Sequence, residues 1–179
     1  MGRLPQFWNT TPPEEVAPYA VDAVAPLDAK RYVRAVTVEA DVATVFRWLC
    51  QLRVAPYSYD WIDNRGRRSP RALVPGLEKL AVGQGFCVIF RLVSFEPGKQ
   101  VTAVMKPGPT RLFGDVALTY QADRLDDRQS RLVCCMVVSG GSSLARLRRT
   151  LLGWGDLVMM RKQLLTLKAC AESTEAVSR

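Results

Sequence analysis

The stretch that decides the fold is residues 131–173, which read RLVCCMVVSGGSSLARLRRTLLGWGDLVMMRKQLLTLKACAES. Residues 131–138 are apolar and β-branched, which is typical of a buried strand. The glycine pair at 140–141 ends that pattern, and Ser142 or Ser143 can cap a helix. Beyond it, apolar residues recur in one stripe at about 100° per residue. They are Leu144, Leu147, Leu151, Trp154, Val158 and Leu165. The stretch predicts a strand and then a helix to about residue 173, whose stripe faces the sheet.

Strand patterns also fill the region before this stretch. Residues 86–96, 100–106 and 112–125 are separated by Pro-Gly or Asp-Asp turns, so with 131–138 they predict an antiparallel meander. Val101, Ala103 and Met105 alternate with wetter residues, which indicates a sheet with one apolar face.

A strand and a helix come before the meander. Residues 31–40 alternate and are rich in β-branched residues. Residues 42–52 have helical apolar spacing, with Asp41 as the expected N-cap. Residues 1–30 carry five prolines and predict an extended arm, packed in part through Phe7, Trp8 and Tyr19. We therefore expect an arm at 1–30 and one domain at 31–175.

The element order predicts an α+β architecture. An antiparallel sheet with one apolar face must bury that face, and the last helix is the only predicted element long enough to cover it. A sheet that curls around this helix leaves a gap between them, which is a natural ligand cavity.

Composition excludes several classes of function. The chain has no histidine, so a Ser-His-Asp hydrolase and His-ligated zinc are excluded. Its five cysteines lie in apolar runs without CxxC spacing, which predicts buried, reduced thiols. The longest apolar stretches are far shorter than the roughly 20 residues of a membrane span, and no signal-peptide pattern begins the chain. We expect a cytoplasmic protein, a monomer or homodimer, without metal or cofactor.

The net charge of +8 comes from 25 basic and 17 acidic residues. Most basic residues are scattered, except for clusters at 65–71 and 146–149 that carry no nucleic-acid-binding signature. A solvated face is the commonest use of such charge. An interaction module that uses its basic face remains an alternative, but no specific nucleic-acid partner is predicted.

Three segments resemble the START/polyketide-cyclase-like superfamily, also called the birch-pollen-allergen-like or helix-grip fold. Residues 34–52 look like its first strand and helix, and residues 159–172 are similar to the end of its last helix. Residues 57–64, continued by 73–83, resemble a second segment found in an uncharacterised bacterial branch. The resemblance covers about residues 31–173. It implies a curved antiparallel sheet wrapped around a long C-terminal helix, with a pocket for a lipid-, sterol- or polyketide-like ligand.

Eight residues are candidate ligand contacts. The aromatic cluster of Tyr57, Tyr59 and Trp61 could rim the pocket and stack on a flat ligand. Trp154, flanked by Gly153 and Gly155, is expected to form part of the pocket wall. The remaining candidates are apolar-face positions of strands and helix, namely Phe90, Met105, Tyr120 and Val158. Arg91 alternates with Phe90 and Leu92, so we expect it on the outer face of the sheet.

The sequence favours binding or carriage of a small hydrophobic ligand over catalysis. The alternative is a cyclase-, aromatase- or dehydratase-like enzyme that uses tyrosine or carboxyl acid-base groups in the same pocket. The candidates for such groups are Glu78, Asp60, Asp63, Tyr59 and Tyr120, and no spacing singles out a pair. A carboxylate in the cavity would favour the enzyme, and a wholly apolar lining would favour the carrier.

Overall fold

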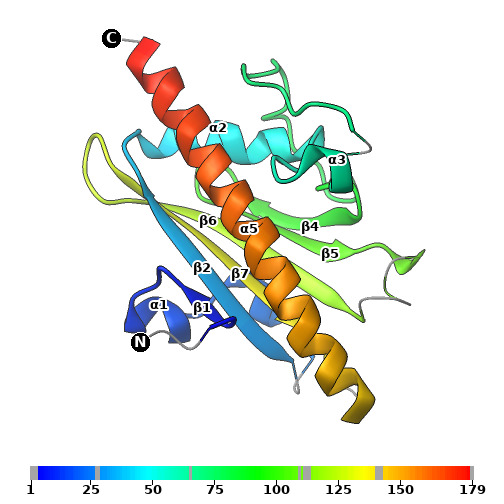
Figure 1. The fold of residues 1–179 in the computed structure, drawn as a ribbon. Helices are drawn as coiled ribbons and strands as arrows, with labels where there is room; N and C mark the ends of the chain where they lie inside the picture. The colour runs from blue at the N-terminus through cyan, green and yellow to red at the C-terminus, as the bar shows by residue number, and fades with distance from the viewer. Residues whose placement is uncertain are drawn as a thin grey trace.

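A curved sheet crossed by one long helix forms the framework of the protein (Figure 1). The computed structural model describes residues 4–26, 29–64, 66–108, 110, 114–139 and 143–177, without the side chains of residues 63 and 143–152. Its seven-stranded sheet has the order β1-β2-β7-β6-β5-β4-β3, and neighbours are antiparallel except for β1 and β2. The strands are β1 (Phe7–Trp8), β2 (Lys30–Val38), β3 (Gly85–Phe86), β4 (Phe90–Glu96), β5 (Gln100–Met105), β6 (Val116–Arg124) and β7 (Ser130–Val138). The predicted meander and the strand before it are confirmed.

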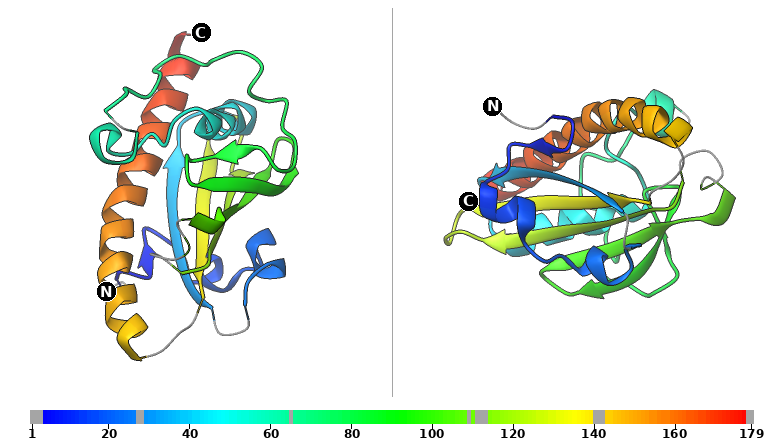
Figure 2. Two further views of the ribbon diagram at one scale, coloured as in Figure 1. Left: turned by 90° about the vertical axis from the view of Figure 1, so that its right-hand side faces the viewer. Right: turned by 90° about the horizontal axis from the view of Figure 1, so that it is seen from below.

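Two helices lie on the inner side of the sheet. The predicted helix 42–52 is present as α2 (Val42–Cys50) and a 3-10 turn, η2 (Gln51–Arg53). The predicted N-cap is confirmed, because the amide of Thr44 donates to Oδ1 of Asp41 at 2.6 Å. The long helix is α5 (Ser143–Val177), which crosses the sheet, and α2 lies beside its C-terminal part (Figures 1 and 2).

The face of the sheet turned away from α5 is covered by the N-terminal residues (Figure 2). Here α1 (Pro12–Val16) and the 3-10 turn η1 (Ala20–Ala23) follow β1. Tyr19 and Val21 are buried in a second apolar cluster with residues of β2, β6 and β7. This face was predicted to be wetter, but Thr102 and Thr119 on it are fully buried and hydrogen-bond each other at 2.8 Å.

The predicted strand 86–96 is interrupted. The chain leaves the sheet after β3 and returns at β4, and the backbone of Cys87 and Val88 between them has φ of 42° and 64°. A positive φ at a β-branched residue such as Val88 is a genuine outlier. As expected, Arg91 points outward and is exposed.

The predicted orientation of the last helix is wrong. Trp154 is 48 % exposed, and Val158 and Leu165 are exposed as well, so these three residues face away from the sheet. The other residues of the predicted stripe, Leu144, Leu147 and Leu151, have side chains outside the described part of the chain. The inner face instead carries Gly153, Asp156, Leu157, Met160, Gln163, Leu164 and Leu167. Apolar residues lie on both faces of the described helix, and on the inner face they are mixed with small and polar groups that meet Tyr32, Arg34 and a cavity.

The prediction that the cysteines are buried is confirmed. Cys50, Cys87, Cys134, Cys135 and Cys170 are all buried and form no disulfide. In the described part of the chain, no helix combines the length and apolarity needed to span a membrane.

Candidate ligand-binding cavity

A cavity of about 550 Å³ lies between the inner face of the sheet and α5. The sheet supplies one wall, made of Tyr32, Phe90, Met105, Val116, Leu118, Tyr120, Met136 and Val138. Helix α5 supplies the opposite wall, made of Gly153, Gly155, Asp156, Met159, Met160 and Gln163. The remaining wall comes from two connecting segments, with Pro56, Ser58, Ile62, Cys87, Val88 and Ile89. Most of these side chains are apolar, so the cavity suits an apolar ligand.

The cavity has its mouth where its lining residues reach solvent. Ile62 on α3 (Asp60–Asp63) and Val88 between β3 and β4 both line the cavity and are about half exposed. Val88, whose φ lies in the left-handed region, is at this mouth and follows the buried Cys87, which shares that conformation. Tyr57, with φ of 56°, lies between the lining residues Pro56 and Ser58. Strained backbone of this kind often accompanies ligand clamps.

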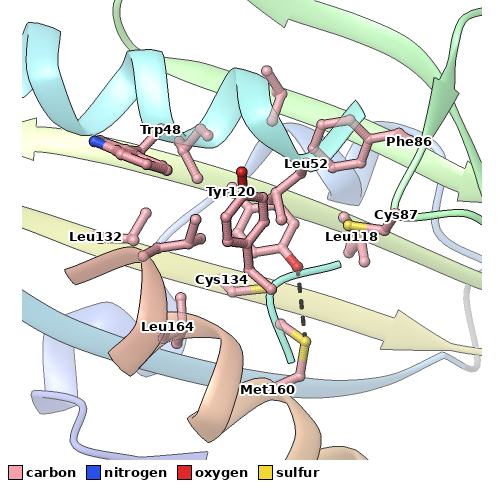
Figure 3. Packing of buried hydrophobic residues seen from close by; sticks show 14 of the residues in the cluster. Trp48, Leu52, Phe86, Cys87, Leu118, Tyr120, Leu132, Cys134, Met160 and Leu164 are labelled. Atoms are coloured by element: carbon pink, nitrogen blue, oxygen red, sulfur yellow. Dashed lines mark hydrogen bonds between the residues drawn. The ribbon is translucent and has the colours of Figure 1, made fainter. Parts of the chain in front are cut away.

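A buried hydrogen-bond network forms part of the cavity wall. The Tyr120 hydroxyl donates to Oε1 of Gln163, whose Nε2 donates to the Pro56 carbonyl at 2.6 Å. The Met160 sulfur lies 3.7 Å from the same hydroxyl, the contact drawn in Figure 3. Burial raises the pKa of Tyr120 well above its usual value, so the phenol is neutral. The tyrosine is thus satisfied by the protein itself.

A charged pair lies beside the cavity, near Gly153 and Gly155. Nη2 of Arg34 on β2 is 2.8 Å from Oδ2 of Asp156 on α5, and the two side chains are 1 % and 23 % exposed. The guanidinium also donates to the Pro5 carbonyl at 3.1 Å and lies 5.3 Å from the centre of the Tyr32 ring. Burial raises the pKa of Asp156 from 3.8 to about 6, and the charge of Arg34 opposes this rise.

The two glycines that flank Trp154 have different surroundings. A Cβ at Gly153 would lie 3.1 Å from Cε1 of Tyr32 and 3.3 Å from Cγ of Pro5, so α5 approaches β2 closely there. A Cβ at Gly155 would meet nothing within 4 Å. Gly153 therefore allows the helix to lie close against the sheet, whereas Gly155 leaves open space at the cavity wall.

The structure brings only part of the predicted site together. Phe90, Met105 and Tyr120 line the cavity. Tyr57 is instead buried against Trp48, with ring centres 5.9 Å apart, and Tyr59 is partly buried outside the lining. Trp61 on α3 is 76 % exposed. Trp154 and Val158 lie on the outer face of α5 rather than in the cavity wall. Contact of any of these residues with a ligand stays a prediction.

The acid-base candidates lie mostly elsewhere. Glu78 pairs with Arg47 at 3.3 Å, and Asp60 accepts hydrogen bonds from Ser69, both away from the cavity lining. The side chain of Asp63 lies outside the described residues. Sequence reasoning missed the polar residues that do approach the cavity, Arg34, Asp156 and Gln163. Arg34 had a detectable signal, because it falls on the apolar side of the alternating strand between Tyr32 and Val36.

No arrangement of three or more His, Cys, Asp and Glu side chains that could hold a metal ion occurs among the described residues. The polar chemistry available at the cavity is therefore that of the charged pair, the amide of Gln163 and hydroxyl groups.

Comparison with solved structures identifies the architecture. A protein from Nitrosospira multiformis matches with a TM-score of 0.53 at 14% sequence identity, over 84% of this chain and 100% of that chain. The di-domain polyketide aromatase/cyclase StfQ of the steffimycin biosynthetic pathway matches with a TM-score of 0.52 at 13% identity. The match covers 83% of this chain and 52% of StfQ. The chain has the helix-grip fold.

The comparisons establish the fold alone. The sequence matches no protein-family model, and no curated protein resembles it significantly. Assignment of this helix-grip domain to a particular bacterial branch stays a prediction. Its function has to be argued from the cavity.

Proposed function

We propose that this helix-grip domain binds and carries a small hydrophobic molecule in the cavity between its sheet and α5. The observation that supports this most is the cavity itself, with a volume of about 550 Å³. Protein interiors pack densely, and voids larger than a water molecule are few. Ligand pockets typically measure roughly 300–1,000 Å³. A space of this size with mostly apolar walls is suited to an apolar ligand.

Four methionines in the lining favour a ligand of bulky or variable shape. Met105 and Met136 project from the sheet, and Met159 and Met160 from α5. The unbranched thioether side chain adapts to irregular surfaces and makes favourable contacts with aromatic rings. A lipid-, sterol- or polyketide-like molecule fits these walls.

Release of a carried ligand requires a mouth that can open. The half-exposed Ile62 and Val88 supply apolar contacts at the mouth, and the strained backbone at Cys87 and Val88 adjoins it. Segments of low local stability are the ones that move during binding. These features support reversible binding. The buried, reduced cysteines support a reducing compartment, the cytoplasm, as the place where the protein works.

A second candidate is a cyclase-, aromatase- or dehydratase-like reaction in the same cavity. Asp156 favours it, because this carboxyl group lines the cavity and burial raises its pKa to about 6. A general base acts best when its pKa lies near the working pH. The ion pair with Arg34 argues against free proton exchange, so binding remains the first proposal.

Native mass spectrometry of the protein purified from the cells that make it tests the proposal. We expect the native protein to carry a bound apolar molecule. Denaturation should release this molecule, and the mass of the polypeptide itself should be unchanged. Protein that carries no adduct, and that gains none when incubated with a lipid extract of those cells, would contradict carriage. Recovery of an extracted ligand in a cyclised or dehydrated form after incubation would favour the enzyme.

A further inference from the structure

The Arg34–Asp156 pair leaves polar atoms without partners. Although Nη2 of Arg34 lies 2.8 Å from Oδ2 of Asp156, its N–H is not aligned for a hydrogen bond, so the contact is an ion pair only. Oδ2 of Asp156 and two guanidinium nitrogens, Nε and Nη1, are buried and have no hydrogen-bond partner in the described chain. A buried polar atom without a partner is costly, and more so when it is charged.

The cavity offers space beside this pair. Asp156 is itself a lining residue, as are Gly153, Gly155 and Met159 around it. A Cβ at Gly155 would meet no atom within 4 Å, so there is open space at the residue that precedes Asp156. The close contact of Gly153 with Tyr32 holds this part of α5 against β2, which carries Arg34. The side chain of Asp156, which is 23 % exposed, is thus fixed next to space that a ligand can fill.

The charges of the pair restrict the chemistry of that ligand. A carboxylate would face the negative charge of Asp156, and an ammonium group would face the positive charge of Arg34. A neutral hydroxyl carries neither charge and can donate a hydrogen bond to the carboxylate of Asp156. A hydrogen bond to a charged acceptor is stronger than one between neutral groups.

We propose, on the basis of the proposed function, that Asp156 binds the hydroxyl or phenol group of a neutral, otherwise apolar ligand. The cavity then selects such alcohols and phenols over carboxylates and over molecules that lack a donor. Arg34 is a positioning residue, which holds the carboxylate at the cavity wall.

Four naphthalene probes of similar size test this selectivity. They are naphthalene, 2-naphthol, 2-methoxynaphthalene and 2-naphthoate, with binding measured by isothermal titration calorimetry at about pH 7.5. This pH lies above the pKa of Asp156, so the carboxylate is ionised. The methoxy compound keeps the oxygen of naphthol but has no donor. Since a hydrogen bond to a charged group accounts for about tenfold or more in affinity, 2-naphthol should bind at least that much tighter than the methoxy compound.

Asp156→Asn is the matching change in the protein, and Glu172→Gln, on the same helix and outside the cavity lining, is its control. The amide introduced by Asp156→Asn would be a weaker acceptor and would leave the charge of Arg34 uncompensated. We expect the preference for naphthol over the methoxy compound to fall to within about threefold, and the affinity for 2-naphthoate to rise. Adding Arg34→Met should remove the gain for naphthoate, which a merely structural arginine would not do. Glu172→Gln should preserve the wild-type order.

Equal binding of naphthol and the methoxy compound to the wild type would overturn the inference, without need of any variant. An unchanged ratio in folded Asp156→Asn would overturn it as well. In both cases binding of naphthalene would leave the proposed function standing. If none of the four probes binds, the proposed function fails and this inference fails with it.

Discussion

Helix α5 has two parts that do different work. From Leu164 to Ala171 its inner face is apolar, and Leu164, Leu167 and Ala171 are almost completely buried in the core. From Gly153 to Gln163 a glycine, a carboxylate and an amide interrupt the inner face, which also carries Leu157 and Met160 and borders the cavity. One continuous helix thus serves as core in one part and as cavity wall in the other. The comparison teaches that apolarity marks the core part, while small and polar residues mark the wall.

Truncating one side chain in each part should give the largest difference. Leu164→Ala should lower the free energy of unfolding by about 3 kcal/mol, because it creates a new cavity in a packed core. Met159→Ala should cost about 1 kcal/mol or less, because this side chain already borders a cavity and is only partly buried. Urea denaturation of the two variants measures the difference. Similar losses would contradict the division of the helix.

The pH dependence of stability should distinguish the wall from the core. Asp156 has a pKa of about 6 in the folded protein against 3.8 when unperturbed, because it is buried. The folded state therefore binds the proton of Asp156 more tightly than the unfolded state does. The stability gained from this protonation is complete below about pH 3.8 and is lost as the pH rises through about 6.

Relative to Asp156→Asn, the wild type should gain on the order of 2 kcal/mol between about pH 7.5 and pH 4.5. Urea denaturation of both proteins at the two pH values gives this difference. The other titrating groups contribute equally to both proteins, so their contributions cancel. A difference that does not change with pH would show that Asp156 is not buried as described.

The two glycines of the wall should respond in opposite directions. Gly153→Ala places a methyl group 3.1 Å from the Tyr32 ring, so it should lower the unfolding free energy by about 1 kcal/mol despite the better helix propensity of alanine. Gly155→Ala enters open space and should raise it by about 1 kcal/mol. Thermal unfolding followed by circular dichroism compares them. Stabilisation of equal size at both positions would mean that α5 does not approach β2 closely.

The outer face of α5 should have the smallest effect. Trp154→Ala should change ligand affinity less than about twofold, because the indole is half exposed and lies outside the cavity lining. Fluorescence titration with N-phenyl-1-naphthylamine tests this. A clear loss of affinity in the folded variant would restore the orientation predicted from the sequence.

The sequence predicts the fold of this protein better than its site. Strand alternation, turn residues and the cap at Asp41 are local signals, and they place the meander, α2 and α5 correctly. Which face of α5 meets the sheet is not a local property. Apolar residues occur both on the stripe through Trp154 and on the face with Gly153 and Asp156, and tertiary contacts with Tyr32 and Arg34 decide which of the two meets the sheet.

Three of the predicted contact residues border the cavity, and each lies on a strand. Phe90, Met105 and Tyr120 line the cavity because alternation assigns their side chains to the inner face. The segment from Tyr57 to Trp61 has no such periodicity. The positive φ of Tyr57 and its packing on Trp48 bury one aromatic ring, while Trp61 stays exposed.

The most direct test of the cavity is a titration of N-phenyl-1-naphthylamine against the wild type, Gly155→Leu and Ala169→Leu. Leucine at residue 155 adds bulk at the cavity wall, and leucine at the exposed residue 169 adds the same bulk to α5 outside the lining. We predict a saturable rise in fluorescence with the wild type and Ala169→Leu, and an affinity at least about tenfold lower with a folded Gly155→Leu, as expected when a side chain occupies a ligand's space. Equal affinity for all three proteins, or no saturable binding to the wild type, would contradict a ligand cavity between the sheet and α5.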